Sequence, residues 1–146
     1  MSSTIKGLDS LFKKLDVIEE VFKSGAMERA VHRGCKTVQA EAKLLCPVDK
    51  GELRNSISTK VEVSNSHVIG KVYTNKEYGP YVELGTGRRG AATYDGDQDI
   101  TYNEEWAGQP AQPFLYPALK NNEKQVLERI TVDIRKEIRK VTGNAK

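Results

Sequence analysis

The sequence predicts an α+β fold: an antiparallel β-hairpin or small sheet packed against two or three amphipathic helices, with a long C-terminal helix. Three observations support this class. Apolar residues recur at helical spacing near both ends of the chain, their spacing changes to every second residue between 57 and 73, and glycine and proline separate these segments. The length of 146 residues is that of one domain, so we expect residues 1–146 to fold as a single unit.

Two helices are predicted before Pro47. The first has apolar residues at steps of three and four from Ile5 to Phe22, and Ser24-Gly25 ends it. The second begins near Ala26 and ends at Pro47, because proline disfavours helical backbone in the residue before it. Small residues on the second helix would allow another element to approach closely; they are Ala30, Gly34, Ala40 and Ala42.

The next segment turns the chain from helix to strand. Asp49 and Glu52 have the spacing of a capping box, with Asp in the place usually taken by Ser or Thr. The single helical turn predicted here would direct Leu53 inward. It would also leave Arg54 free for an ion pair, for which Glu83 is a candidate partner.

A β-hairpin follows. Residues alternate between apolar and polar from Ile57 to Val63, Ser64-Asn65-Ser66 has turn chemistry, and a second strand runs from Val68 to Tyr73.

A short element from Tyr78 to Leu84 ends at Gly85, and residues 88–108 then show no helical or strand period of useful length. So long a loop is typical of a functional or partly disordered segment. Ile100 and Tyr102 are candidates for a short strand inside it.

The C-terminal helix follows a stiff segment. Pro110 and Pro113 fix the backbone beyond the loop, and Pro117 lies in the favoured first turn of the helix. The apolar stripe predicted for this helix consists of Leu119, Val126, Leu127, Ile130, Ile134, Ile138 and Val141.

Composition indicates an ordinary soluble protein with a modest core, since 38% of residues are hydrophobic and 29% are charged. There is no apolar run of about 18 residues, the length that crosses a membrane. Met1 leads into polar residues rather than into a signal peptide. We therefore expect no membrane contact, and a protein made and kept in the cytosol.

Charge is unevenly distributed along the chain. The net charge of +3 does not mark a nucleic-acid binder. Acidic residues lie between Tyr94 and Trp106, however, and basic residues dominate from Lys120 onward. These two segments either meet across a subunit boundary or form two separate solvated surfaces.

No constellation for catalysis or metal binding is visible. His32 and His67 are the only histidines, and neither has the neighbours of a catalytic base. Cys35 and Cys46 would be about 16 Å apart on one helix, beyond disulfide reach, and are expected to be small buried hydrophobic residues. The run Asp95-Gly96-Asp97-Gln98-Asp99 imitates a calcium loop but lacks its turn glycine and final glutamate. We expect no catalytic residue, no cofactor and no metal.

Three aromatic residues of the polar loop are candidate protein contacts: Tyr94, Tyr102 and Trp106. Tyr and Trp are frequent anchors of protein interfaces. Stacking on single-stranded bases would require interleaved Lys or Arg, which the sequence lacks between Tyr94 and Trp106.

Three segments together resemble a known family. They are Pro47-Val48-Asp49-Lys50-Gly51-Glu52-Leu53-Arg54-Asn55-Ser56-Ile57, Tyr78-Gly79-Pro80-Tyr81-Val82-Glu83-Leu84-Gly85-Thr86 and Pro110-Ala111-Gln112-Pro113-Phe114-Leu115-Tyr116-Pro117-Ala118-Leu119. In this order and spacing they are similar to the tail-component proteins of long-tailed phages, over about residues 5–140. Lys50 stands where threonine is common, and the 88–108 loop is longer than a minimal member needs.

The resemblance implies a non-enzymatic structural protein of a phage or prophage virion, assembled in the cytoplasm of the bacterial host. It implies a homo-oligomeric ring, expected to be hexameric, that forms or completes the head–tail neck or the upper end of the tail. The ring would contact neighbouring neck or tail proteins and let DNA pass. The structural motif residues are Pro47, Asp49, Gly51, Glu52, Leu53, Arg54, Glu83, Gly85, Pro110, Pro113 and Pro117.

Function is expected in the 88–108 loop, while the motif segments hold the body in shape. The alternative is a nucleic-acid-binding module that uses the basic C-terminal helix. Lys136, Arg139 and Lys140 would then face DNA, or else an acidic partner. An enzyme that depends on His32 and His67 is the third and least favoured class.

Overall fold

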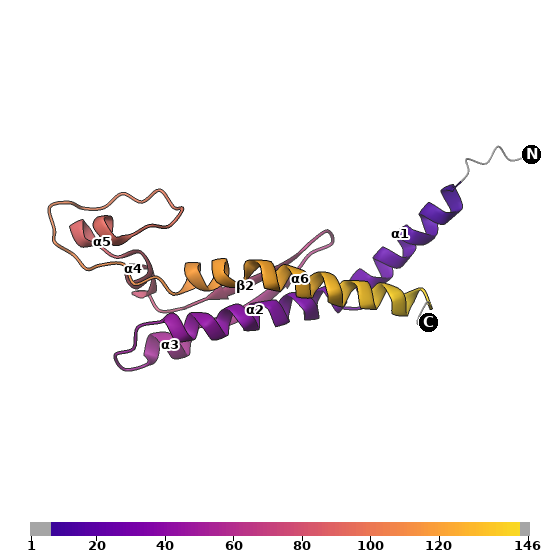
Figure 1. The fold of residues 1–146 in the computed structure, drawn as a ribbon, viewed down its shortest axis with the longest axis horizontal. Helices are drawn as coiled ribbons and strands as arrows, with labels where there is room; N and C mark the ends of the chain where they lie inside the picture. Colours follow the sequence, from indigo (N-terminus) through magenta and orange to yellow (C-terminus); the bar gives the residue numbers. More distant parts are fainter. Residues whose placement is uncertain (1–6, 144–146) are drawn as a thin grey trace, which may run out of the picture.

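The computed structural model describes residues 7–143 (Figure 1). In chain order its elements are α1 (Leu8–Lys23), α2 (Ala26–Leu45), α3 (Glu52–Ser56), β1 (Ser58–Val63), β2 (Val68–Tyr73), α4 (Gly79–Leu84), α5 (Gly87–Thr93) and α6 (Leu115–Val141). The α+β class, the hairpin and the long C-terminal helix predicted from the sequence are confirmed. Ile5, the predicted start of the first helix, and Lys146, the last basic residue of the tail, lie outside the described residues.

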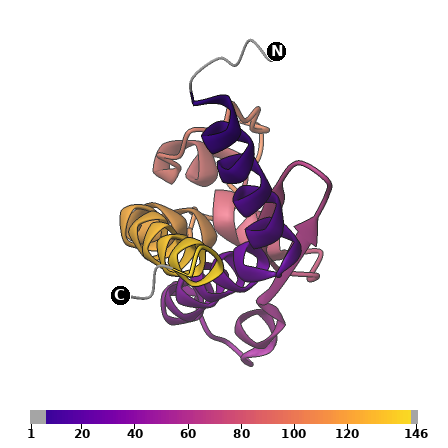
Figure 2. The same ribbon diagram turned by 90° about the vertical axis from the view of Figure 1, so that its right-hand side faces the viewer.

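Helix α2 is central, because α6 and both strands pack against it (Figure 2). Its small residues permit the close approach that the sequence predicts. A Cβ added to Gly34 would lie 2.6 Å from Cγ1 of Val126 in α6. A Cβ added to Gly70 of β2 would lie 2.6 Å from Cγ1 of Val31 in α2. Glycine at both positions therefore brings three elements together.

A polar contact also joins α2 to α6. The side-chain amides of Asn121 and Asn122 donate hydrogen bonds to the Glu41 carboxylate, the first at 2.7 Å. These hydrogen bonds lower the pKa of Glu41 from its usual value, because they stabilise the charged form.

The hairpin is antiparallel, with Ser58 opposite Tyr73 and Val63 opposite Val68. Its turn closes with a hydrogen bond of 2.9 Å from the backbone N–H of Ser64 to the carbonyl of His67. His67 therefore lies at the exposed tip, among turn residues.

The core lies where α2, α3 and the start of α6 meet. Leu53 is buried, as predicted, and Phe114 and Ile57 are the largest fully buried side chains. The buried apolar cluster consists of Val38, Ala42, Cys46, Leu53, Ile57, Phe114 and Ala118.

The predicted capping box is wrong. Helix α3 begins after Gly51, and no side-chain hydrogen bond from Asp49 or another residue caps it. Gly51 has a φ of 80°, in the left-handed region that glycine adopts without steric cost. The turn into α3 therefore depends on Gly51, not on the spacing of Asp49 and Glu52.

The irregular loop predicted for residues 88–108 is wrong in part, because α5 occupies Gly87–Thr93. This helix is made of Gly, Arg, Ala and Thr, so it has no apolar period that a sequence pattern could reveal. Residues 100–102 form no strand, contrary to the candidate strand at Ile100 and Tyr102.

Two helices expose apolar side chains. Figure 1 shows α1 leaving the body near the start of α2 and pointing away from it. Half or more of each of four α1 side chains is exposed: Leu11, Phe12, Leu15 and Ile18. In α6, Leu119 and Leu127 are also more than half exposed, so the predicted stripe of that helix is not one buried face.

Candidate functional site

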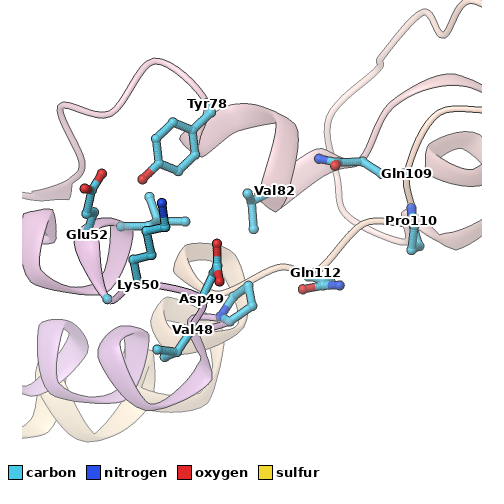
Figure 3. Close-up of a pocket in the computed structure, with 12 residues that line it drawn as sticks. Val48, Asp49, Lys50, Glu52, Tyr78, Val82, Gln109, Pro110 and Gln112 are labelled. Carbon is cyan, nitrogen blue, oxygen red and sulfur yellow. The ribbon is translucent and has the colours of Figure 1, made fainter.

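The three sequence segments that carry the family resemblance meet and line one recess of about 360 Å³ (Figure 3). Its walls come from residues 47–53 between α2 and α3, from Tyr78 and Val82 of the α4 region, and from Gln109, Pro110 and Gln112 ahead of α6. Figure 3 shows Asp49, Lys50 and Tyr78 on one side and Gln109 and Pro110 on the other. The lining combines apolar and charged groups.

Backbone hydrogen bonds hold the walls together. The N–H of Gln112 donates to the carbonyl of Val82 at 2.8 Å. The side-chain amide of Gln109 donates to the carbonyl of Tyr81 at 2.9 Å. The chain ahead of α6 is therefore hydrogen-bonded to α4 at two points, one through the backbone and one through a side chain.

Glu83, at the end of α4, is buried and caps α6. Its carboxylate accepts hydrogen bonds from the backbone N–H groups of Phe114, Leu115 and Tyr116 at 2.7, 2.9 and 2.8 Å. The first N–H groups of a helix have no partner within the helix, and a negative charge is favourable at that end. Glu83 therefore links α4 to the start of α6, two elements that the loop from 86 to 109 separates in the sequence.

The predicted ion pair between Arg54 and Glu83 is wrong. It is not among the ion pairs within 4 Å in residues 7–143. Arg54 donates instead to the carbonyl of Cys46 at 3.4 Å, and its buried Nε has no hydrogen-bond partner. The Glu83 carboxylate instead accepts hydrogen bonds from backbone N–H groups at the start of α6.

The loop between α4 and α6 is closed at its base. The N–H of Thr86 donates to the carbonyl of Gln109 at 2.9 Å, and the N–H of Gln109 donates back to the carbonyl of Thr86 at 3.1 Å. Gly85 turns the chain into this base with a φ of 72°, and a Cβ there would lie 2.6 Å from the backbone N of Ala111. The two ends of the loop from 86 to 109 are therefore hydrogen-bonded to each other.

The three predicted aromatic contacts lie in different surroundings. Tyr102 is half-buried and its hydroxyl donates to the carbonyl of Leu84 at 2.7 Å, so it ties the loop to α4. Tyr94 is half-buried and accepts from the N–H of Gln98 at 3.3 Å. Trp106 is 58% exposed, so it is the aromatic residue of the three that is open to a partner.

The acidic part of the loop contacts α6 of the same chain. The Tyr116 hydroxyl donates to the Asp97 carboxylate at 2.6 Å, and Lys120 Nζ lies 3.9 Å from the same carboxylate. This hydrogen bond is the main reason that the pKa of Tyr116 rises to about 12. The acidic and basic segments thus meet within one subunit at this point.

Lys136, Arg139 and Lys140 are exposed near the end of α6. None of them forms an ion pair within 4 Å in the described part of the chain. Asp133, on the same helix, pairs with Arg33 at 2.9 Å and not with any of these three basic side chains.

The residues with catalytic chemistry are dispersed. His32 lies exposed on α2, away from His67 at the hairpin tip. Cys35 and Cys46 are free and buried, and burial raises the pKa of both thiols. Residues 7–143 contain no group of three or more His, Cys, Asp or Glu side chains placed to hold a metal ion. Over the same residues, no helix is long and apolar enough to cross a membrane.

Sequence reasoning missed the recess and the role of Glu83. It treated the three segments as separate turns, whereas in the structure residues of all three line one recess. An acidic residue in the otherwise apolar segment Tyr81-Val82-Glu83-Leu84 was the available signal, because a buried carboxylate needs donors.

The described residues thus form an α+β fold in which the three segments line one recess. Comparison with protein-family models matches residues 9–85 to the family described as "Bacteriophage HK97-gp10, putative tail-component". This match covers just over half of the chain, including the first of the three segments and all of the second except Thr86. The chain therefore belongs to this family of phage tail components, whose members are typically structural. No curated protein and no solved structure matches the chain.

Proposed function

We propose that the protein is a subunit of a hexameric ring at the head–tail neck or at the upper end of a phage tail. Family membership supports a structural role in the tail. The finer position rests on how the exposed apolar side chains are distributed.

The observation that carries this proposal is a molecule with an apolar surface at each end. Figure 1 shows an elongated chain with α1 at one end and the α4–α5 region at the other. At the α1 end, Leu11, Phe12, Leu15 and Ile18 are exposed. At the other end, Val48, Tyr78, Tyr81 and Trp106 are exposed around the recess and the loop. A subunit of a stacked ring needs two such surfaces, one toward its copies and one toward the next component.

The end with the recess is the surface for a neighbouring neck or tail protein. Trp106 is its anchor, because a large aromatic side chain loses much exposed area for little conformational entropy. The recess at the same end of the molecule offers a hollow for a side chain of the partner.

Labelling of virions tests the position directly. Phage particles carrying the full chain with an epitope at its C-terminus are imaged after binding of a gold-labelled antibody. Gold at the junction between head and tail is the expected result, together with rings in micrographs of the purified protein. Gold at the distal tip of the tail, or particles without the protein, would overturn the proposal.

The second candidate is DNA binding by α6, favoured by the exposed Lys136, Arg139 and Lys140, which form no ion pair within residues 7–143. Contacts to phosphate release counterions, so affinity for duplex DNA would fall steeply with salt. The triple substitution to Gln should abolish this affinity if these residues bind DNA. Unchanged virion assembly in the triple variant would show that DNA contact by α6 is not the function.

A further inference from the structure

Five apolar residues of α1 follow the spacing of a coiled-coil seam. The steps between them are three, four, three and four residues, the alternation of a and d positions in a heptad. The seam consists of Leu8, Leu11, Leu15, Ile18 and Phe22. This spacing favours another helix as the partner of this face. In a coiled coil, each a or d side chain fits between four side chains of the facing helix.

The described fold leaves the middle of this seam uncovered, while Leu8 and Phe22 at its ends are half-buried. Val21 packs against the body and is 3% exposed, whereas Leu11, Leu15 and Ile18 on the seam are 50%, 50% and 59% exposed. Phe12 extends the same surface at the e position and is 54% exposed. A contiguous apolar patch of this kind is typical of an interaction site.

The charges that flank the seam identify the partner. Lys14 occupies a g position and Glu19 the e position five residues later. In a parallel pair of helices, a g residue of one helix faces the e residue five positions later on the other. In a parallel bundle, Lys14 of one copy would therefore face Glu19 of the next copy, and Lys14 of that copy would face Glu19 of the copy after it. An antiparallel pair would place g residues opposite g residues and e residues opposite e residues, so Lys14 and Glu19 would not pair.

Both charged groups are available for this contact. Lys14 forms no ion pair within 4 Å among residues 7–143. Glu19 contacts Lys23 at 2.6 Å, but both side chains are exposed, so the Glu19 carboxylate can accept a second cation.

We propose that the α1 helices of neighbouring copies of this chain pack side by side in parallel, with Lys14 of one copy paired to Glu19 of the next. This inference rests on the proposed self-association and names the segment that carries it. Parallel helices place all bodies on the same side of the contact, as in copies arranged around a ring axis. Two heptads associate weakly alone, so other contacts of the ring contribute to its stability.

A charge exchange in the full-length chain tests the pairing. Lys14→Glu alone places two carboxylates opposite each other, the new one and that of Glu19 in the next copy. Glu19→Lys alone places two ammonium groups opposite each other in the same way. Each variant should associate about tenfold more weakly than the wild type in sedimentation velocity at low salt. An equal mixture of the two restores both attractive pairs, so it should associate as tightly as the wild type.

Matched controls make the same charge changes away from the seam. Lys13 and Glu20 occupy f positions on the opposite side of the helix. Lys13→Glu and Glu20→Lys should leave association unchanged. Circular dichroism of all four variants checks that α1 remains helical.

A disulfide test fixes the direction of the helices. Leu11→Cys places a thiol at a d position, which faces its own copy in a parallel pair in register. Oxidation should give a dimer across this residue, whereas Ser10→Cys at a c position should not. Cys35 and Cys46 are buried and do not compete.

The outcomes separate this inference from the proposed ring. If the wild type assembles but the mixture of charge variants shows no recovery, the α1 pairing is wrong and the ring proposal stands on other contacts. If the wild type remains monomeric at about millimolar concentration, above the range of weak specific complexes, the α1 pairing is also wrong. Gold at the distal tip of the tail would overturn the neck position without affecting the pairing.

Discussion

The buried carboxylate of Glu83 accepts a hydrogen bond of 2.7 Å from the backbone N–H of Phe114, 31 residues further along the chain. With the bonds from Leu115 and Tyr116, this contact lets α4 determine where α6 begins. The start of the longest helix is thus set by a side chain from across the loop.

Replacing Glu83 should destabilise the fold more than an exposed charge does. Glu83→Gln keeps one acceptor oxygen but turns an NH₂ group toward backbone donors, so we expect the free energy of unfolding to fall by about 2 kcal/mol. Urea unfolding followed by circular dichroism measures this change. Glu77→Gln, at an exposed position, is the control and should have little effect. A loss below about 0.5 kcal/mol for Glu83→Gln would contradict the capping role.

Gly34→Ala should also destabilise the protein, although alanine is the better helix former. The added Cβ would lie 2.6 Å from Val126 Cγ1. Overpacking of this kind costs about 1–3 kcal/mol, against a gain of about 1 kcal/mol in helix propensity. Val126→Ala removes the clashing methyl groups, so the double variant should be more stable than the sum of the single changes. Strictly additive changes in unfolding free energy would show that α2 and α6 do not meet there.

The Tyr116 phenol should ionise at higher pH than an ordinary tyrosine does. Its pKa is raised to about 12, mainly because the neutral hydroxyl donates to Asp97. An unfolded tyrosine ionises near pH 10, so the stabilisation from this bond is present below about pH 10 and is lost as pH rises through about 12. The difference in tyrosinate absorbance between the wild type and Tyr116→Phe isolates this group. Asp97→Asn should lower its pKa toward the usual value; an unchanged titration in Asp97→Asn would exclude the carboxylate as the cause.

Substitutions of Tyr102 and Trp106 should have different effects, the first on stability and the second on partner binding. Tyr102→Phe removes the donor to the Leu84 carbonyl, so it should cost about 1 kcal/mol of unfolding free energy. Trp106→Ala should leave stability nearly unchanged and weaken capture of the neighbouring neck or tail protein at least tenfold, as loss of an interface anchor of about 2 kcal/mol would. Leu127→Ala, a change at an equally exposed position on α6, serves as the control. Equal binding by the Trp106 and Leu127 variants would remove Trp106 from the interface.

Local patterns predicted most of the regular structure. The alternation from Ile57 to Val63 predicted the hairpin, and the steps of three and four predicted α1, because both signals depend on neighbouring residues. Helix α5 was missed because its Gly, Arg, Ala and Thr residues have no apolar period. The capping box failed because a glycine two residues after Asp49 provides a left-handed turn that spacing alone does not exclude.

The site depended on contacts that spacing cannot show. Opposite charges near two turns led to the prediction of an ion pair between Arg54 and Glu83. In the structure, backbone N–H groups at the start of α6 bind the Glu83 carboxylate instead of Arg54. The recess likewise exists only once three segments, each ordinary by itself, have been brought together by the core around Phe114 and Leu53.

The paired hydrogen bonds between Thr86 and Gln109 have a consequence for how such a protein diversifies. A segment whose two ends already touch can change length at small cost, since doubling a flexible loop costs only about 0.6 kcal/mol of closure entropy. Insertions or deletions between these two residues that keep the contacts of Tyr102 with Leu84 and of Asp97 with Tyr116 would leave the body in place. The proposed contact loop can therefore change its length while the fold that carries it keeps its structure.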